Sequence, residues 1–331
     1  MTSVLHTRRL RLLELAGGDV KHLSAASGLV RVGRRFYVVA DDELSLGAFL
    51  IEGDAPGTLL QLAAGTLPQG HAARKAAKPD CEALTLLPAQ TAYPHGALLA
   101  LGSGSRPTRE RGFVLPLDIL GQTAGAPEVV DLAPLYAPLR AEFGDLNIEG
   151  AFVTAGRLTL LQRGNRGDGR NAGIDFDASA FGGWLAGDGP APAAAGHALF
   201  DLGDIKGVPL GFTDGAALGD DGAWVFSAAA EDTGSSYNDG ACLGSVVGVV
   251  DRTGRMVLQA RLATVCKVEG VALQANANAN ANANAEANAE ANAEVEAEAE
   301  ADGSVQLLLV TDADDRNQPA HLLSCRLPKL F

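Results

Sequence analysis

The chain contains 331 residues with a formal net charge of −14, and 40 of its residues are glycine. This acidic balance opposes sequence-independent binding to DNA or RNA, which needs clustered Lys and Arg, and no run approaches the roughly 20 apolar residues of a membrane-spanning helix. With no secretory pattern in the first residues, we expect a cytoplasmic protein, monomeric, that binds neither nucleic acid nor a membrane.

A unit of two short apolar runs joined by a tight turn recurs five times, and each copy is predicted to form a β-hairpin. The copies begin at Ser27, Glu82, Glu149, Asp214 and Glu269. The steps between them are 55, 67, 65 and 55 residues, somewhat longer than the period of about 40 to 50 residues of four-stranded propeller blades, which loops lengthen. The repeat therefore predicts an all-β, five-bladed β-propeller of four-stranded antiparallel blades, with six blades as the alternative.

The predicted elements follow one another in the same pattern along the chain. After a first strand come five hairpins, each followed by one or two further strands. Their residue ranges are 4–15; 27–43, 45–52 and 57–63; 82–105, 111–118 and 128–134; 149–165, 172–177 and 197–203; 214–232, 243–251 and 255–263; 269–315 and 320–327.

The fifth unit lacks one strand, while the strand at residues 4–15 has no unit of its own. An open ring would leave backbone groups unpaired at a sheet edge, which is an aggregation hazard. We therefore predict that the N-terminal strand completes the last blade, so that residues 1–331 form one propeller domain. Prolines at positions 127, 134 and 138 exclude a long helix between residues 123 and 140.

Residues 275–301 alternate Ala with Asn and then Ala with Glu, inside the fifth hairpin. These residues are poor strand formers that bury little surface, so we predict a disordered low-complexity insertion. It is either the functionless product of repeat slippage or an acidic lid over one mouth of the ring.

The cysteines Cys81, Cys242, Cys266 and Cys325 are far apart in the sequence and form no CxxC pair. A zinc site would need paired Cys or His spacings, and disulfides are rare in the cytosol. The sequence therefore predicts free, buried thiols.

The first residue of each hairpin marks the candidate site. Equivalent positions in a ring lie on one circle, so four carboxylates and Ser27 are expected to converge where the innermost strands begin. Converging carboxylates cannot all stay ionised unless cations or hydrogen-bond donors lie among them. Ca²⁺ or another divalent cation suits such oxygen ligands, and arginine is the alternative. The predicted metal ligands are Glu82, Glu149, Asp214 and Glu269.

A second polar set stands at the ends of the second strands. A hairpin reverses direction, so these residues are expected on the same face as the first set, and together the two sets form the predicted ligand-binding mouth. The second set consists of Asp41, Asp42, Arg106, Arg163, Asn165, Glu231, Asp232, Asp312 and Arg316. Arginine forks suit carboxylate or phosphate groups on a ligand, but the same charges could instead tie neighbouring blades together.

The Glu-Gly pairs at Glu149-Gly150 and Glu269-Gly270 resemble those of phytase-like esterase and gluconolactonase-type propellers. At the repeat level the chain also looks like uncharacterised bacterial β-propeller proteins. The first resemblance implies that an acidic residue at such a place binds a central divalent metal, usually calcium. The chain departs from those families in having five units instead of six and in lacking an obvious catalytic dyad.

These features predict a propeller that binds a small molecule at a carboxylate-rich mouth. In the enzyme version, a bound cation polarises an ester, lactone or phosphate and a carboxylate such as Glu149 or Glu269 acts as base. Standard phosphate-loop, zinc-protease and serine-hydrolase motifs are absent from the sequence, so no catalytic residue is assigned. The alternative is a non-catalytic scaffold that binds a protein partner.

Overall fold

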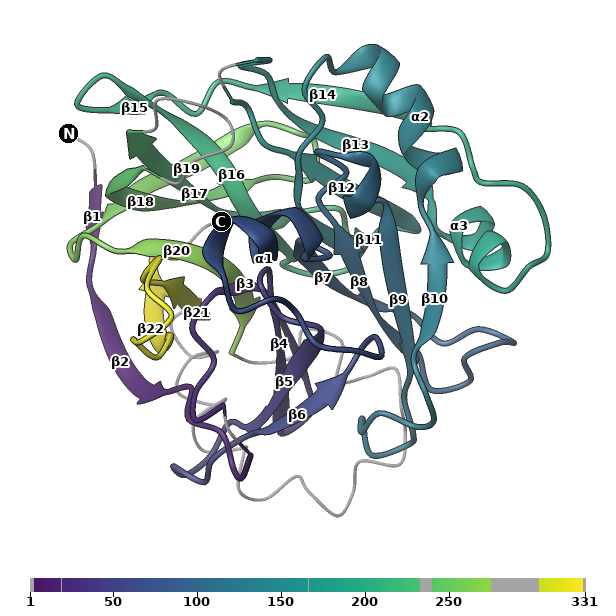
Figure 1. Ribbon diagram of the computed structural model, residues 1–331. Helices are drawn as coiled ribbons and strands as arrows, with labels where there is room; N and C mark the ends of the chain where they lie inside the picture. Colours follow the sequence, from purple (N-terminus) through teal and green to yellow (C-terminus); the bar gives the residue numbers. More distant parts are fainter. Residues whose placement is uncertain (1–2, 19, 166, 233–239, 275–303, 330–331) are drawn as a thin grey trace.

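The computed structural model describes residues 3–18, 20–165, 167–232, 240–274 and 304–329. The chain is a five-bladed β-propeller whose blades are four-stranded antiparallel sheets arranged around a central axis (Figure 1). The predicted fold and blade count are thus confirmed. The Ala/Asn/Glu insertion predicted at residues 275–301 lies outside the described residues.

In blades 1 to 4 the four main strands run in sequence order from the axis outward. Blade 1 contains β3 (Ala26–Val32), β4 (Arg35–Ala40), β5 (Ser45–Leu50) and β6 (Thr58–Gln61). Blade 2 contains β7 (Cys81–Leu87), β8 (Ala97–Gly102), β9 (Arg111–Pro116) and β10 (Glu128–Asp131). Blade 3 contains β11 (Ile148–Thr154), β12 (Arg157–Gln162), β13 (Asn171–Asp177) and β14 (Gly196–Phe200). Blade 4 contains β16 (Val208–Ala217), β17 (Trp224–Asp232), β18 (Ala241–Val250) and β19 (Met256–Leu262), with the short β15 (Asp204–Ile205) against β16. Blade 5 contains β20 (Lys267–Leu273), β21 (Val305–Asp312) and β22 (His321–Leu327).

The N-terminal segment closes the ring in two steps. β2 (Thr7–Leu12) pairs antiparallel with β22 and supplies the fourth strand of blade 5. The shorter β1 (Ser3–Leu5) pairs in parallel with β19 at the outer edge of blade 4. The predicted N-terminal strand is therefore two strands, and it joins blades 4 and 5 along their outer edges.

Alternation along the strands explains why the blades pack on one another. Each hydrophobic cluster fills the space between two neighbouring blades, as the one that joins Leu84 and Leu98 of blade 2 to Tyr37 of blade 1 does. On the same two strands of blade 2, Ala83 and Leu99 point the other way, into the cluster shared with blade 3. Because successive side chains of a strand point to opposite faces of the sheet, each blade packs against both of its neighbours.

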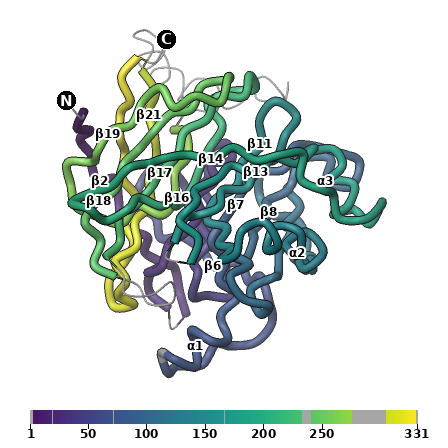
Figure 2. The backbone as a smooth tube through the Cα atoms, turned by 90° about the horizontal axis from the view of Figure 1, so that it is seen from above, coloured from purple at the N-terminus to yellow at the C-terminus, as the bar shows by residue number. Residues whose placement is uncertain are grey.

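Within the part of the chain that the structure describes, three helices and one 3-10 turn interrupt the strands. They are α1 (His71–Ala77), η1 (Pro107–Arg109), α2 (Ala133–Glu142) and α3 (Ala178–Leu185). α1 lies over the centre of the ring in Figure 1 and stands out from one side of the molecule in Figure 2. Among the described residues, no helix is both long and apolar enough to cross a membrane. The four cysteines are free, and Cys81 and Cys325 are buried, but Cys242 and Cys266 are only partly buried, so the prediction of buried thiols is wrong for these two.

Candidate functional site

The mouth is the face of the ring at which the innermost strands β3, β7, β11, β16 and β20 begin. In blades 2, 3 and 5 the pairing of the first strand with the second shifts by one residue near the beginning of the first strand. The extra residue is Glu82 in blade 2, Glu149 in blade 3 and Glu269 in blade 5. A β-bulge re-aims the side chain of the extra residue. The three glutamates therefore hold equivalent places in their blades, as the repeat predicts.

Blade 4 departs from this pattern. Its register shift places Thr213 at the bulge, because Phe212 pairs with Ala228 and Asp214 already pairs with Ser227. The expected equivalence of Asp214 with the three glutamates is therefore wrong by one residue. Asp214 occupies the place that Gly150 holds in blade 3.

Asp214 is fully buried on the inner side of the ring. One of its carboxylate oxygens accepts hydrogen bonds from the backbone amides of Val271 at 2.9 Å and Leu29 at 3.4 Å, and the other accepts from Gly215 at 2.8 Å. Burial raises its pKa well above the ordinary value, although these amides oppose the rise. The side chain thus joins the innermost strands of blades 4, 5 and 1.

A guanidinium lies among the acids of blades 3, 4 and 5. Arg163 pairs with Glu149 at 3.3 Å and Glu231 at 2.8 Å, and it lies 4.0 Å from Glu269. Its side chain is only 13% exposed. Burial would lower the pKa of Arg163, but the three glutamates outweigh burial and raise it.

Lys267 extends the same network into blade 5. Its ammonium lies 3.1 Å from Glu269, 3.4 Å from Glu231, 3.6 Å from Asp312 and 3.0 Å from Asp314. Burial raises the pKa of Asp312 to about 8 in spite of this neighbour. Acids from the beginning of one strand and the end of the next therefore meet here on one face.

A second group of carboxylates lies between blades 1 and 2. Asp41, Asp80 and Glu82 each place one oxygen within 4.8 Å of the other two. Lys78 contacts both aspartates, and its ammonium lies 2.8 Å from Asp80. Arg109 lies 2.7 Å from the other oxygen of Asp80.

Glu82 is the exception within this carboxylate group. Among the described residues, no hydrogen bond or ion pair within 4.0 Å reaches its carboxylate, whereas both aspartates are paired. Burial, followed by Asp80 and Asp41, raises the pKa of Glu82 well above the ordinary value. Of the four acids predicted to bind metal, Glu82 alone belongs to this group.

The α1 segment brings basic groups onto this part of the mouth. Arg74 of α1 lies 3.3 Å from Asp42 and 2.6 Å from Glu43. Arg316, which follows β21, approaches Asp42 at 3.3 Å from the other side. α1 lies over the centre of the ring in Figure 1, and Arg74 and Lys78 bring their charges from this segment to carboxylates of blades 1 and 2.

The remaining predicted site residues lie at the rim. Arg106 is exposed in the turn before η1, and Asp232 is exposed at the end of β17. The side-chain oxygen of Asn165 accepts hydrogen bonds from the backbone amides of Gly167 and Asp168, so this side chain stabilises the loop in which it lies. Among the described residues, neither Asn165 nor Asp232 joins the ion-pair network of the buried acids.

Sequence reasoning missed Arg74, Lys78, Asp80 and Lys267. A signal for two of them is present in the sequence, because Asp80 and Lys267 each stand two residues before a mouth glutamate. Arg74 and Lys78 come from a helical segment between blades, whose position no strand pattern specifies.

Acidic side chains therefore outnumber basic side chains at the mouth. The chemistry available to it is the binding of a cation or of a ligand that carries both charges, because buried acids left in excess are stabilised by a positive partner. Oxygen-only ligands favour Ca²⁺ or Mg²⁺ over softer metals.

Comparison with known proteins identifies a family and a number of structures with a similar fold, among them the two that follow. A family model described as "Family of unknown function (DUF6929)" matches residues 22–327. The crystal structure of Myxococcus xanthus glutaminyl cyclase is similar over 99% of both chains, with 11% sequence identity and a TM-score of 0.49. MPT-4, a mannose phosphorylase from Leishmania mexicana whose structure contains phosphate ion, covers 100% of this chain and 90% of its own, with 10% identity and a TM-score of 0.42. No curated protein matches the sequence.

Proposed function

The chain belongs to the DUF6929 family, and from its own residues we propose that it is a small-molecule-binding β-propeller whose mouth takes a divalent cation at Asp41, Asp80 and Glu82. The observation that carries this proposal is the convergence of three carboxylate oxygens within 4.8 Å of one another. Oxygen ligands from three carboxylates suit Ca²⁺, which binds flexible sets of hard donors.

Lys78 gives the proposed site two states. In the structure described here its ammonium contacts Asp41 and Asp80, so it supplies the positive charge that the aspartates need. Those two aspartates and Glu82 raise the pKa of Lys78, although burial opposes the rise. Deprotonation therefore does not clear the site near neutral pH, and a cation enters when the Lys78 side chain swings away with the end of α1.

The proposal extends to hydrolysis of an ester, lactone or phosphate. A cation at this site would polarise the oxygen of a bound substrate. Glu149 is the candidate base because Glu82 and Glu149 are close enough to interact electrostatically and burial raises the pKa of Glu149 despite Arg163. Arg163 is placed to hold an anionic group of the substrate.

A non-catalytic scaffold is the second candidate, and one observation favours it. Arg163 of blade 3 joins Glu231 of blade 4 and lies near Glu269 of blade 5, so much of the charge at the mouth already ties blades together. In that case the mouth would need no cation, and the protein would bind its partner through the face of the ring.

Thermal unfolding in the presence of Ca²⁺, Mn²⁺ or Mg²⁺ distinguishes the two candidates. A ligand that binds only the folded state stabilises it by about 2.7 kcal/mol at a hundred times its Kd, so we expect at least one of these ions to raise the melting temperature by several degrees. Glu82→Gln should abolish the rise. Asp220→Asn, which changes an exposed carboxylate on the opposite face, is the matched control and should preserve it.

Lys78→Met provides the decisive variant for the two-state site. Removing the competing ammonium should make cation binding tighter by tenfold or more, measured by calorimetric titration, while the cation-free protein becomes less stable. Unchanged affinity would show that Lys78 does not compete. No stabilisation by any divalent ion, in either the natural chain or Lys78→Met, would favour the scaffold.

If the cation binds, hydrolysis is tested with p-nitrophenyl acetate and p-nitrophenyl phosphate. Cation-dependent turnover that Glu149→Gln removes, with cation binding intact, would support the enzyme version. Cation binding without turnover of either substrate would leave a binding protein and reject hydrolysis of these two classes.

A further inference from the structure

The segment that joins blade 1 to blade 2 carries α1 onto the mouth. α1 lies over the centre of the ring in Figure 1, and in Figure 2, which is turned by 90°, it projects from one side of the molecule. The two views place the helix on one face of the ring. The contacts of Arg74 and Lys78 with carboxylates of blades 1 and 2 identify this face as the mouth. We call residues 64–78 the α1 arm.

The α1 arm has no apolar anchor. Its buried side chains are Arg74 and Lys78, which are 6% and 8% exposed, whereas the four alanines of α1 are exposed. Leu67 is the one large apolar residue of the arm and is only partly buried. Among the described residues, none in the arm belongs to a hydrophobic cluster of the blades. Burial of apolar surface is the main force that fixes a segment in a fold, so the arm depends on its charges instead.

Two acids of blade 1 hold the middle of the arm. Arg74 lies 2.6 Å from Glu43 and 3.3 Å from Asp42, and both acids follow β4. Neither acid belongs to the carboxylate group of Asp41, Asp80 and Glu82. The pairs of Arg74 therefore form a latch that lies outside the proposed cation site.

The end of the arm occupies the proposed cation site itself. Lys78 contacts Asp41 and lies 2.8 Å from Asp80, and these are two of the three carboxylates that converge there. An ammonium and a bound metal ion would compete for the same oxygens. The described position of the arm is therefore a closed state of the site.

The arm can leave the mouth without breaking a blade. Among the described residues, no backbone–backbone hydrogen bond joins the arm to a strand. Gly65 has a φ of +109°, and a Cβ at Gly65 or Gly70 would have nothing within 4 Å, so these two glycines provide unhindered hinges. α1 has seven residues and no side-chain cap at Gly70, and a helix this short is marginal without tertiary support.

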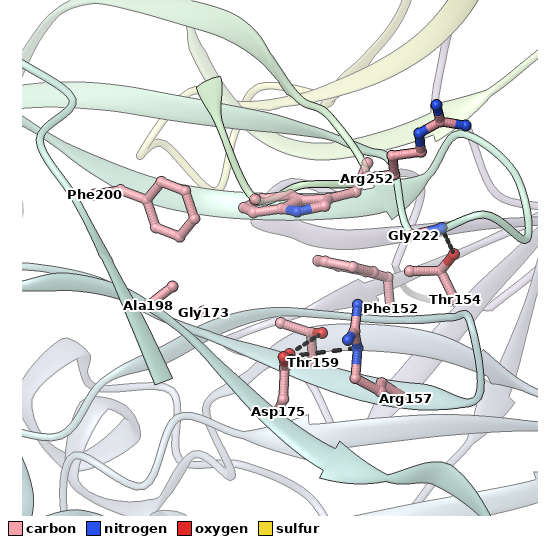
Figure 3. Close-up of a pocket in the computed structure, with 12 residues that line it drawn as sticks. Phe152, Thr154, Arg157, Thr159, Gly173, Asp175, Ala198, Phe200, Gly222 and Arg252 are labelled. Carbon is pink, nitrogen blue, oxygen red and sulfur yellow. Dashed lines mark hydrogen bonds and ion pairs between the residues drawn. The ribbon is translucent and has the colours of Figure 1, made fainter. Parts of the chain in front are cut away.

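The cavity drawn in Figure 3 is separate from this site. It has a volume of about 80 Å³ and lies between blades 3 and 4, where Thr154 and Arg157 flank the turn that joins β11 to β12. The mouth lies at the opposite end of these strands, and none of its described carboxylates lines the cavity. The cavity therefore gives no second way to the carboxylates that the arm occupies.

We propose that the α1 arm is a lid on the cation site, latched by Arg74 to Asp42 and Glu43 and displaced when a divalent cation binds. The identity of the incoming ligand rests on the proposed function, whereas the latch acts in the cation-free protein. A site that is available only in the open fraction of the molecules binds with an affinity reduced by that fraction. The latch thus sets the apparent affinity of the mouth through residues that never touch the cation.

Hydrogen exchange in the cation-free protein tests the latch. Glu43→Gln removes the shorter ion pair of Arg74, so the amides of residues 72–78 should exchange at least fivefold faster than in the parent. Glu52→Gln is the matched control, because Glu52 also pairs with an arginine of blade 1, Arg34, but is 50% exposed, and it should leave these amides unchanged. Equal protection in Glu43→Gln and the parent overturns the lid, and so do amides that are already unprotected in the parent.

Calorimetric titration with Ca²⁺ tests the control of the site, because the lid predicts an unusual sign. Removing an acid near a bound cation ordinarily weakens binding, since an attractive charge is lost. Glu43→Gln should instead bind Ca²⁺ at least threefold more tightly, because its site is open in more of the molecules. In the parent, Ca²⁺ should also speed exchange at residues 72–78. Weaker binding by Glu43→Gln would overturn the control of the site by the latch.

The lid and the cation site fail separately. Unchanged exchange in Glu43→Gln together with normal Ca²⁺ binding would remove the lid and leave the cation site. Faster exchange in a chain that binds no divalent cation would remove the proposed function and leave a lid that admits another ligand. Circular dichroism verifies that each variant is folded.

Discussion

At the scale of single residues, the mouth is held together by cations that serve more than one blade. Arg163 comes from blade 3 but pairs with Glu231 of blade 4 and approaches Glu269 of blade 5. Removing one partner from a buried ion pair leaves an uncompensated charge, which costs about 3 to 5 kcal/mol. The network therefore makes the packing of three blades depend on the ionisation of a few side chains.

The ionisation of Glu231 predicts the direction in which the stability of the fold changes with pH. Burial would raise its pKa, but Arg163 and Lys267 outweigh burial and lower it to about 2 from an ordinary 4.5. A carboxylate with a lowered native pKa stabilises the fold fully above its unfolded pKa, and the contribution is lost as the pH falls through 4.5 toward 2. Between pH 7 and pH 3 this amounts to about 2 kcal/mol.

We therefore expect the natural chain to lose about 2 kcal/mol more unfolding free energy than Glu231→Gln between pH 7 and pH 3. Urea unfolding at the two pH values measures this double difference. Glu52→Gln is the control, because Glu52 is 50% exposed in its pair with Arg34 and should behave as the natural chain does. An equal loss in Glu231→Gln would contradict the depressed pKa.

The residue scale also shows what the sequence could predict about the site. The repeat identifies Glu149 and Glu269, and the end of a hairpin identifies Arg163. Lys78 could not be identified, since it reaches the carboxylates from the residue after α1, a helical connection between blades 1 and 2. The strand periodicity predicts positions within the blades and does not specify where a connection between blades places its side chains.

At the scale of elements, a glycine follows the predicted mouth residue in every blade except blade 2, where Ala83 follows Glu82, and this glycine has a packing role. A Cβ at Gly28 would lie 2.5 Å from the backbone nitrogen of Leu84 in the next blade, and one at Gly270 would lie 2.7 Å from the carbonyl oxygen of Ser27. Neighbouring innermost strands thus approach one another too closely for a side chain. The Glu-Gly pair marks this close approach as well as a carboxylate.

Gly28→Ala is expected to destabilise the protein by about 1 to 3 kcal/mol, because the backbone of blade 2 must move to admit the methyl group. Gly196→Ala is the matched control, since a Cβ at Gly196 would have nothing within 4 Å and should change stability by less than about 0.5 kcal/mol. Urea denaturation compares the two variants. A Gly28→Ala protein as stable as Gly196→Ala would mean that the innermost strands can separate at little cost.

Two elements show where sequence patterns lose precision. In blade 4 the Asp-Gly pair resembles the Glu-Gly pairs, but the bulge falls on Thr213, because register depends on cross-strand packing that the pair itself does not specify. The prolines exclude a long helix near residue 130, yet the ten-residue α2 forms with one proline in its first turn and Pro138 inside. A short helix on the outside tolerates this loss because Leu135, Tyr136 and Leu139 are buried.

At the scale of the whole molecule, closure of the ring depends on the first residues of the chain. β2 covers the outer edge of β22, and β1 covers the outer edge of β19. Leu5 also belongs to the hydrophobic cluster between blades 4 and 5. The count of strands predicted that the N-terminus completes the last blade, but it could not predict that the segment divides between two blades, because both strands lie in one continuous strand-like stretch of sequence.

Deletion of residues 2–12 tests this closure against deletion of residues 2–5, which removes β1 alone. The longer deletion exposes the edge of β22, and unpaired strand edges promote association between chains. We expect a lower melting temperature and aggregation that increases with protein concentration, whereas the shorter deletion removes only three parallel pairs and should have the smaller effect. Differential scanning calorimetry and light scattering at several concentrations measure both quantities. If the two deletion variants were equally stable and both monomeric, β2 would contribute nothing to the closure of the ring, which would then depend on the inner strands alone.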